Sequence, residues 1–179
     1  MINRIACCIA LCVICLAGFA CSNATKETPQ PIAAPPASQP AAPAAAPAPL
    51  APSAYRVEWV SNLIPSEMAA SQNQKVSVTL KNAGDGTWPA KGTGGGPVNQ
   101  VLISYHWLPA QGDKAVLWDG VRSALPHDIG PGETFTQNVT VIAPKDPGSY
   151  RLQLTLVHEG VTWFEVKGAS GLTVPVTVR

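Results

Sequence analysis

Apolar and polar residues alternate with a period of two through residues 55–179, and this pattern limits the folds open to the chain. Val76, Val78 and Leu80 alternate with polar neighbours, and the same alternation returns over residues 101–107, 135–141, 150–156 and 172–178. Shorter candidate strands cover residues 55–60 and 116–118. A period of two places successive side chains on opposite faces of a β-strand. No part of this region keeps a helical period, so the sequence predicts an all-β fold.

Clusters of Gly, Pro, Asp and Asn separate these segments, at residues 82–86, 111–113, 119–120, 130–132 and 146–148. Such clusters mark turns. About seven strands in about 125 residues predict an immunoglobulin-like antiparallel β-sandwich over residues 54–179.

One local motif supports this fold. Residues 146–150 have the Asp-x-Gly-x-Tyr spacing of a tyrosine corner, in which the Tyr150 hydroxyl bonds back to the loop and fixes the next strand. Trp107 lies where such sandwiches carry a buried tryptophan. All five cysteines lie within the first 21 residues, so aliphatic packing must replace an intersheet disulfide.

The amino terminus has the pattern of a secretory signal peptide over residues 1–20. Arg4 precedes an apolar run of 16 residues, shorter than the roughly 20 that a membrane-spanning helix needs. Residues 16–21 resemble a lipobox, which implies acylation of Cys21. Ordinary signal peptidase also accepts small residues before Cys21, so a soluble secreted protein is the alternative.

Residues 21–53 are predicted to be a lipidated cysteine followed by a tether. Between residues 24 and 53 the chain has 11 alanines and nine prolines. Proline opposes helix formation, so an extended spacer reaching up to roughly 90 Å is expected. Ser22 stands where an acidic residue would retain a lipoprotein at the inner membrane. The expected location is therefore the bacterial cell envelope, anchored by lipid at the outer membrane.

Residues 82–89 carry an Asn-x-Gly…Thr-Trp pattern, and further matches follow in order up to residues 158–164. This set resembles the four-tryptophan (FW) immunoglobulin-like domain of the "next to breast-cancer gene" autophagy-receptor family, which has bacterial relatives. The block around residues 104–126 resembles a variant attached to polysaccharide-biosynthesis proteins. The resemblance implies a non-enzymatic interaction domain.

The chemistry-bearing residues do not form a recognisable catalytic or metal motif. His106, His127 and His158 lack the paired spacing of metal ligands, and Ser123, His127 and Asp128 lack a nucleophile elbow. Residues 55–179 have ten Lys/Arg and ten Asp/Glu, without the basic face that nucleic acid needs. We therefore expect no enzyme activity, cofactor, metal or nucleic-acid partner.

The remaining candidates for ligand contacts are aromatic side chains, mainly tryptophans. Trp88 follows a turn, and Trp163 and Phe164 end a long strand, so these three are candidate ligand contacts if they are partly exposed. The alternative is that they close the ends of the sandwich. Trp59, Trp107 and Tyr150 are expected to be structural. The predicted function is binding of a protein partner in the envelope, with binding of a glycan or polysaccharide as the alternative.

We expect Cys21→Ser to abolish acylation, because only the Cys21 thiol stands at the predicted cleavage site. Metabolic labelling with palmitate, followed by recovery of the protein from membranes, measures this. Unchanged labelling of the variant would contradict the lipobox assignment.

Overall fold

The structure is a computed structural model that describes residues 50–179. The predicted signal peptide, Cys21 and most of the predicted tether lie outside the described residues. Leu50 already packs against the hydrophobic core. Over residues 50–179, no helix has the length and apolar character required to cross a membrane.

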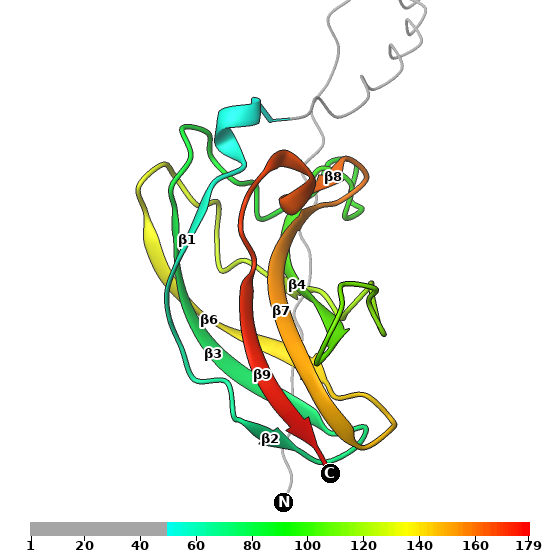
Figure 1. The fold of residues 1–179 in the computed structure, drawn as a ribbon. Coiled ribbons are helices and arrows are strands. Elements are labelled where there is room, and N and C mark those ends of the chain that lie inside the picture. Colours follow the sequence, from blue (N-terminus) through cyan, green and yellow to red (C-terminus); the bar gives the residue numbers. More distant parts are fainter. Residues whose placement is uncertain (1–49) are drawn as a thin grey trace, which may run out of the picture. The chain divides into compact units, whose positions relative to one another are not determined.

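Two β-sheets face each other (Figure 1). The three-stranded sheet has the order β1 (Val57–Asn62), β3 (Asn73–Asn82), β6 (Thr134–Ile142). The six-stranded sheet has the order β2 (Glu67–Met68), β9 (Leu172–Val178), β7 (Gly148–His158), β4 (Val101–Pro109), β5 (Ser123–Ala124), with β8 (Thr162–Trp163) beside β7. Two 3-10 helices, η1 (Pro52–Ala54) and η2 (Glu165–Lys167), complete the elements of this region.

The predicted immunoglobulin-like antiparallel β-sandwich is confirmed. The described residues form nine strands against about seven expected. Three of the nine, β2, β5 and β8, are only two residues long. One pairing departs from the antiparallel pattern, since β2 runs parallel to the carboxyl-terminal strand β9.

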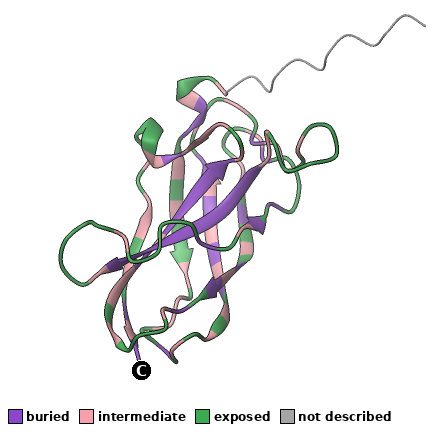
Figure 2. Ribbon diagram, turned by 90° about the vertical axis from the view of Figure 1, so that its right-hand side faces the viewer, coloured by how far each residue is buried: buried purple, intermediate pink, exposed green. Residues whose placement is uncertain are grey.

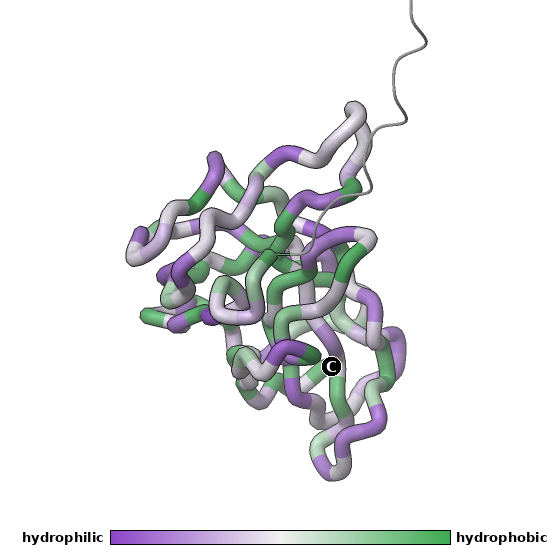
Figure 3. Tube along the Cα trace, turned by 90° about the horizontal axis from the view of Figure 1, so that it is seen from above, coloured by the Kyte–Doolittle hydropathy of each residue, from purple (hydrophilic) through white to green (hydrophobic). Residues whose placement is uncertain are grey.

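Alternation sets the register of the three-stranded sheet. Val76 lies opposite Val139, and Leu80 lies opposite Phe135. These side chains are buried and face the other sheet, whereas their polar neighbours face solvent. Hydrophobic and hydrophilic residues therefore alternate along the chain (Figure 3). A slip of one residue would expose the whole apolar set, so this pattern specifies the pairing.

Strand β4 is buried on both faces, which its alternation did not predict (Figure 2). Val101, Ile103, Tyr105 and Trp107 face the core as expected. The intervening residues are buried too, and Ser104 and His106 fully so. Their cover includes residues 116–122. The prediction of a strand at residues 116–118 is wrong, because this segment makes only an isolated bridge from Leu117 to Trp107.

The tyrosine corner is present, since the Tyr150 hydroxyl donates to the Asp146 carbonyl at 2.9 Å. Trp107 is fully buried, and its indole nitrogen donates to the Ile142 carbonyl at 2.8 Å across to the other sheet. Trp59 packs against the core and donates to the Ser170 carbonyl at 3.0 Å. These three aromatic residues thus have polar atoms fixed by backbone partners.

One end of the sandwich is closed by an aromatic cluster. The Phe164 ring meets Tyr55 and Trp88 edge-on, with centroids 5.0 Å and 5.4 Å away. The Tyr55 hydroxyl lies 2.9 Å from Nδ1 of His158, whose Nε2 lies 2.7 Å from Oδ1 of Asn99. A neutral imidazole satisfies both contacts by accepting at Nδ1 and donating at Nε2.

The loop after β3 fits against this end. Asn82 is fully buried, and its side-chain amide donates to the Gly86 and Ile129 carbonyls at 2.9 and 3.0 Å. Gly84 and Gly86 abut Ala54 so closely that an added Cβ would come within 2.8 Å of it. The glycines of this motif are therefore required by close contact with η1.

We expect His158 to make stability depend on pH. Burial disfavours the imidazolium and holds the pKa of His158 below its ordinary value of 6.5. As the pH falls below 6.5, the unfolded chain therefore takes up a proton that the folded protein does not, so stability decreases. His158→Gln should flatten this dependence between about pH 5 and 7, measured as thermal unfolding midpoints. A wild-type and variant pair with equal slopes would contradict the assignment.

Candidate functional site

The structure places two of the three predicted ligand contacts inside the protein. Trp88 and Phe164 are both 0% exposed, so neither meets the condition of partial exposure under which it was a candidate ligand contact. The Trp88 indole nitrogen donates to the Ala54 carbonyl at 2.8 Å, beneath η1. Both rings close the end of the sandwich, which was the alternative interpretation. Trp163 is partly exposed and lies in a different cluster.

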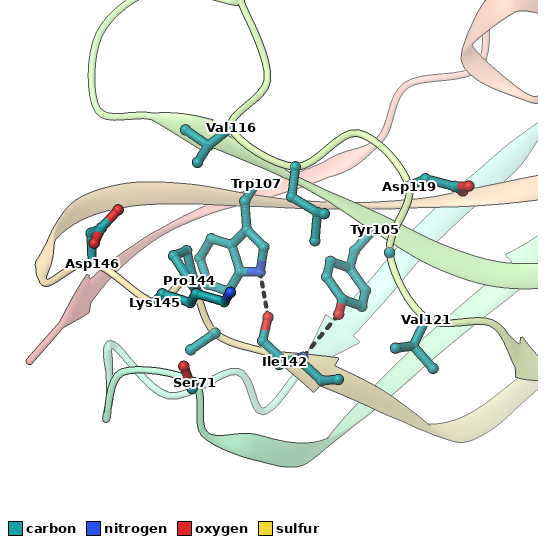
Figure 4. A pocket seen from close by; sticks show the side chains of 13 residues that line it. Ser71, Tyr105, Trp107, Val116, Asp119, Val121, Ile142, Pro144, Lys145 and Asp146 are labelled. Carbon is teal, nitrogen blue, oxygen red and sulfur yellow. Dashed lines mark hydrogen bonds between the residues drawn. The ribbon is translucent and has the colours of Figure 1, made fainter.

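A groove with a volume of about 610 Å³ opens on the flank of the sandwich (Figure 4). We call it the flank groove, and it is formed by the following residues: Ser71, Tyr105, Trp107, Val116, Leu117, Asp119, Gly120, Val121, Ile142, Ala143, Pro144, Lys145 and Asp146. Lys145 and Asp146 lie at one end, whereas Asp119 and Val121 lie at the other (Figure 4). Its size is within the range of ligand-binding clefts.

The base of the flank groove presents apolar surface, because the polar side-chain atoms of Tyr105 and Trp107 are already hydrogen-bonded to the backbone. The Tyr105 hydroxyl accepts from the Ile142 amide at 2.9 Å, and Trp107 donates to the carbonyl of the same residue. Gly120 approaches Tyr105 so closely that an added Cβ would lie 2.5 Å from the Tyr105 carbonyl oxygen. The Gly120 amide donates to that carbonyl at 3.0 Å. This contact fixes one wall of the groove to β4.

A second surface lies over the outward face of β4 and β7. We call it the outer aromatic cluster, and it consists of His106, Trp118, Arg122 and Trp163. The Trp118 ring stacks on the fully buried His106 ring, with centroids 3.9 Å apart and planes 12° apart. Trp163 meets Trp118 edge-on at 6.0 Å, and the Arg122 guanidinium lies 4.9 Å from the centre of the Trp163 ring.

Polar contacts hold this cluster in place. His106 faces an acceptor at each ring nitrogen, the Trp118 carbonyl at Nδ1 and Glu165 at Nε2, the latter at 2.7 Å. Burial alone would raise the pKa of Glu165, but hydrogen bonds from His106 and Thr155 outweigh it and leave the pKa below its ordinary value. Glu165 is therefore a carboxylate at neutral pH. It ties η2 to β4 through His106 and to β7 through Thr155.

Arg122 links the outer aromatic cluster to two carboxylates, Asp119 and Glu159. Its Nε donates to Glu159, and its Nη1 pairs with Asp119 and donates to the Gly120 carbonyl at 2.8 Å. Burial would lower the pKa of Arg122, but these carboxylates raise it above its ordinary value, so the guanidinium stays charged.

The residues weighed for catalysis are not brought together. Ser123 Oγ accepts from the Thr140 amide at 3.0 Å, and Asp128 accepts from the Ala90 amide at 2.7 Å. His127 pairs instead with Glu133 at the surface. Over residues 50–179, no group of three or more His, Cys, Asp or Glu side chains is arranged to hold a metal ion.

Sequence reasoning missed Trp118, which is 49% exposed and central to the outer aromatic cluster. Its position in a short apolar segment indicated a strand, not a cover over the outward face of β4. The signal that could have found it is the run of apolar residues 115–118 directly before the Asp119-Gly120 turn.

The chain matches no protein-family model and no curated protein. It is similar to a solved β-glucosidase from Listeria innocua bound to isofagomine, with a TM-score of 0.41 and 16% identity, over 69% of this chain and 16% of that chain. The CARDB domain of a Pyrococcus furiosus protein gives a TM-score of 0.39 and 17% identity, over 69% and 92% of the two chains. A Niemann-Pick type C2 protein from Japanese carpenter ant gives 0.42 and 10%, over 69% and 93%. Likeness at this level carries no argument about function.

We expect Trp88→Ala to destabilise the fold by about 3–5 kcal/mol, because it removes a buried indole and leaves a cavity. Chemical denaturation of the variant beside Trp118→Ala measures the difference, since Trp118 is half exposed and should cost less. Equal losses of stability in the two variants would contradict the assignment of Trp88 to the core.

Proposed function

We propose that the chain is an envelope-anchored, non-catalytic interaction module that binds a protein partner through the flank groove. The observation that carries this proposal is the distribution of exposed apolar side chains. Val116, Leu117, Val121 and Ile142 all line the groove, and they are four of the nine large hydrophobic residues exposed in residues 50–179. Apolar side chains gathered around one concave surface are typical of interaction sites.

The backbone around the groove indicates what kind of partner fits. The edge of β4 that faces away from β7 already has backbone partners near Trp107. The Trp107 amide donates to the Leu117 carbonyl, and the Trp107 carbonyl accepts from the Val116 and Leu117 amides. The outward amides at the end of β6 are taken by Ser123 and Tyr105. An added β-strand would find these backbone groups already bonded. The groove suits apolar side chains inserted from the surface of a folded protein.

The charged residues at the two ends of the groove further restrict the chemistry of the partner. Lys145 and Asp146 at one end and Asp119 at the other present charges of both signs. A central apolar group flanked by polar residues of mixed charge matches this arrangement, as in protein interfaces with an apolar core and a polar rim. A strongly acidic or basic partner has no matching field.

The predicted anchor supports a location for this module. Acylated Cys21 and an extended Ala/Pro spacer would hold the domain at the outer membrane while letting it reach a partner. The proposal includes membership of the FW type of immunoglobulin-like domain, supported by the Asn-x-Gly…Thr-Trp pattern at residues 82–88. Glycan binding remains the second candidate, favoured by the outer aromatic cluster.

A photo-crosslinking amino acid at position 116 should give a specific adduct with an envelope protein in intact cells. The same probe at position 60 is the matched control, because Val60 is 52% exposed and Val116 is 55% exposed. We expect Val121→Asp to abolish the adduct from position 116, since a carboxylate in the groove opposes burial of apolar groups.

The adduct is then identified by mass spectrometry, and affinity for the purified partner is measured with and without Val121→Asp. Equal adducts from positions 60 and 116, or adducts that persist with Val121→Asp, would refute the role of the groove. Unfolding midpoints of the variant exclude a loss of fold.

A further inference from the structure

The indole of Trp118 is a rigidly supported, exposed aromatic surface. One face of its ring is covered by His106, which is itself fully buried and held at both ring nitrogens. Because 49% of Trp118 is nevertheless exposed, the accessible part belongs to its other face and its rim. A ligand that stacks there meets a ring already fixed in place, so little conformational entropy is lost on binding.

The second indole of the cluster, Trp163, already carries a cation of the protein. Arg122 lies over Trp163 and is held there by Glu159 and Asp119. The position that a ligand cation would take on the second indole is thus occupied by a cation of the protein itself.

The same neighbours disfavour an anionic ligand. Asp119, Glu159 and Glu165 surround the cluster, and Arg122 pairs with the first two. Three carboxylates stand against one guanidinium and the imidazole of His106, so a phosphate or a uronate would meet like charge. An uncharged ligand fits the cluster without meeting the excess of carboxylates and without displacing Arg122 from Trp163.

The remaining polar groups match hydroxyls. Asp119 is 68% exposed on its side chain and offers a carboxylate that accepts hydrogen bonds. Within residues 50–179, Nη2 of Arg122 makes no hydrogen bond, so it can donate to a ligand oxygen. A pyranose ring combines an apolar C–H face, which stacks on indole, with equatorial hydroxyls that both donate and accept.

We propose that the outer aromatic cluster is a binding subsite for a neutral, hexose-based glycan, with Trp118 as the stacking surface and Asp119 and Arg122 as its hydroxyl partners. This subsite rests on the second candidate function, glycan binding, and its indole lies on the opposite side of segment 116–122 from the apolar lining of the groove. Val116 and Val121 line the groove, and Trp118 and Arg122 belong to the cluster, whereas Asp119 borders both.

Isothermal titration and tryptophan fluorescence of the full chain test this subsite. The neutral probes are cellohexaose, maltohexaose and N-acetylchitohexaose, and the charged probes are hexagalacturonate and chitosan hexamer. We expect at least one neutral probe to bind with a Kd of about 1 mM or tighter. Failure of all three neutral probes at about 10 mM, or binding of charged probes alone, overturns the proposal.

Variants then locate the binding. Trp118→Ala should weaken it by about tenfold or more, and Asp119→Asn by about threefold, because each removes one part of the recognition. Trp118→Phe keeps a ring over His106 and should retain part of the affinity, which separates lost contact from lost fold. Undiminished affinity in both Trp118→Ala and Asp119→Asn overturns the assignment.

The groove variant Val121→Asp is the matched control and should leave glycan affinity unchanged. If Val121→Asp abolishes the protein adduct while glycan binding persists, the two sites are independent. Loss of glycan binding in Val121→Asp with an intact Trp118 would instead assign the glycan to the groove and overturn the subsite.

Discussion

The burial of both faces of β4 is the constraint on which the rest of the surface depends. Its inward residues pack into the core between the sheets, as in any sandwich. Its outward residues include Ser104 and His106, which are polar and fully buried. Buried polar groups need hydrogen-bond partners, so the chain must supply a cover that carries them. Ser104 donates to the Gly120 carbonyl at 3.0 Å, and His106 bonds to Trp118 and Glu165.

This cover produces both candidate surfaces at once. Segment 116–122 bridges to the edge of β4, and its Gly120 is pinned against Tyr105. Once it is pinned, Val116 and Val121 line the groove on one side, while Trp118 and Arg122 lie over the outward face of the sheet on the other. Groove and cluster therefore share one short stretch of backbone whose position is set by the polar residues of β4.

The sequence was sufficient for the fold because the relevant signals are local. Alternation in β3, β6, β7 and β9, the turn clusters and the Asp146–Tyr150 corner each act within a few residues. It was insufficient for the site because exposure of an aromatic residue depends on distant segments. Trp88 follows a turn, yet Ala54 and Ile129 cover it from 34 and 41 residues away. Trp118 sits in a strand-like pattern, yet its position is set by His106.

Within the domain, the residues that maintain the fold are likewise different from the residues that form the two candidate surfaces. The Asn82–Trp88 motif is accounted for by packing, since Asn82, Gly84, Gly86 and Trp88 all make contacts that hold η1 or the closed end of the sandwich. None of these four residues lines the flank groove or the outer aromatic cluster. A chain can therefore keep this motif, and with it the fold, while residues 116–122 change. Under the proposed function, the ligand preference of this chain would follow the cover of β4, and resemblance in the motif alone does not transfer it.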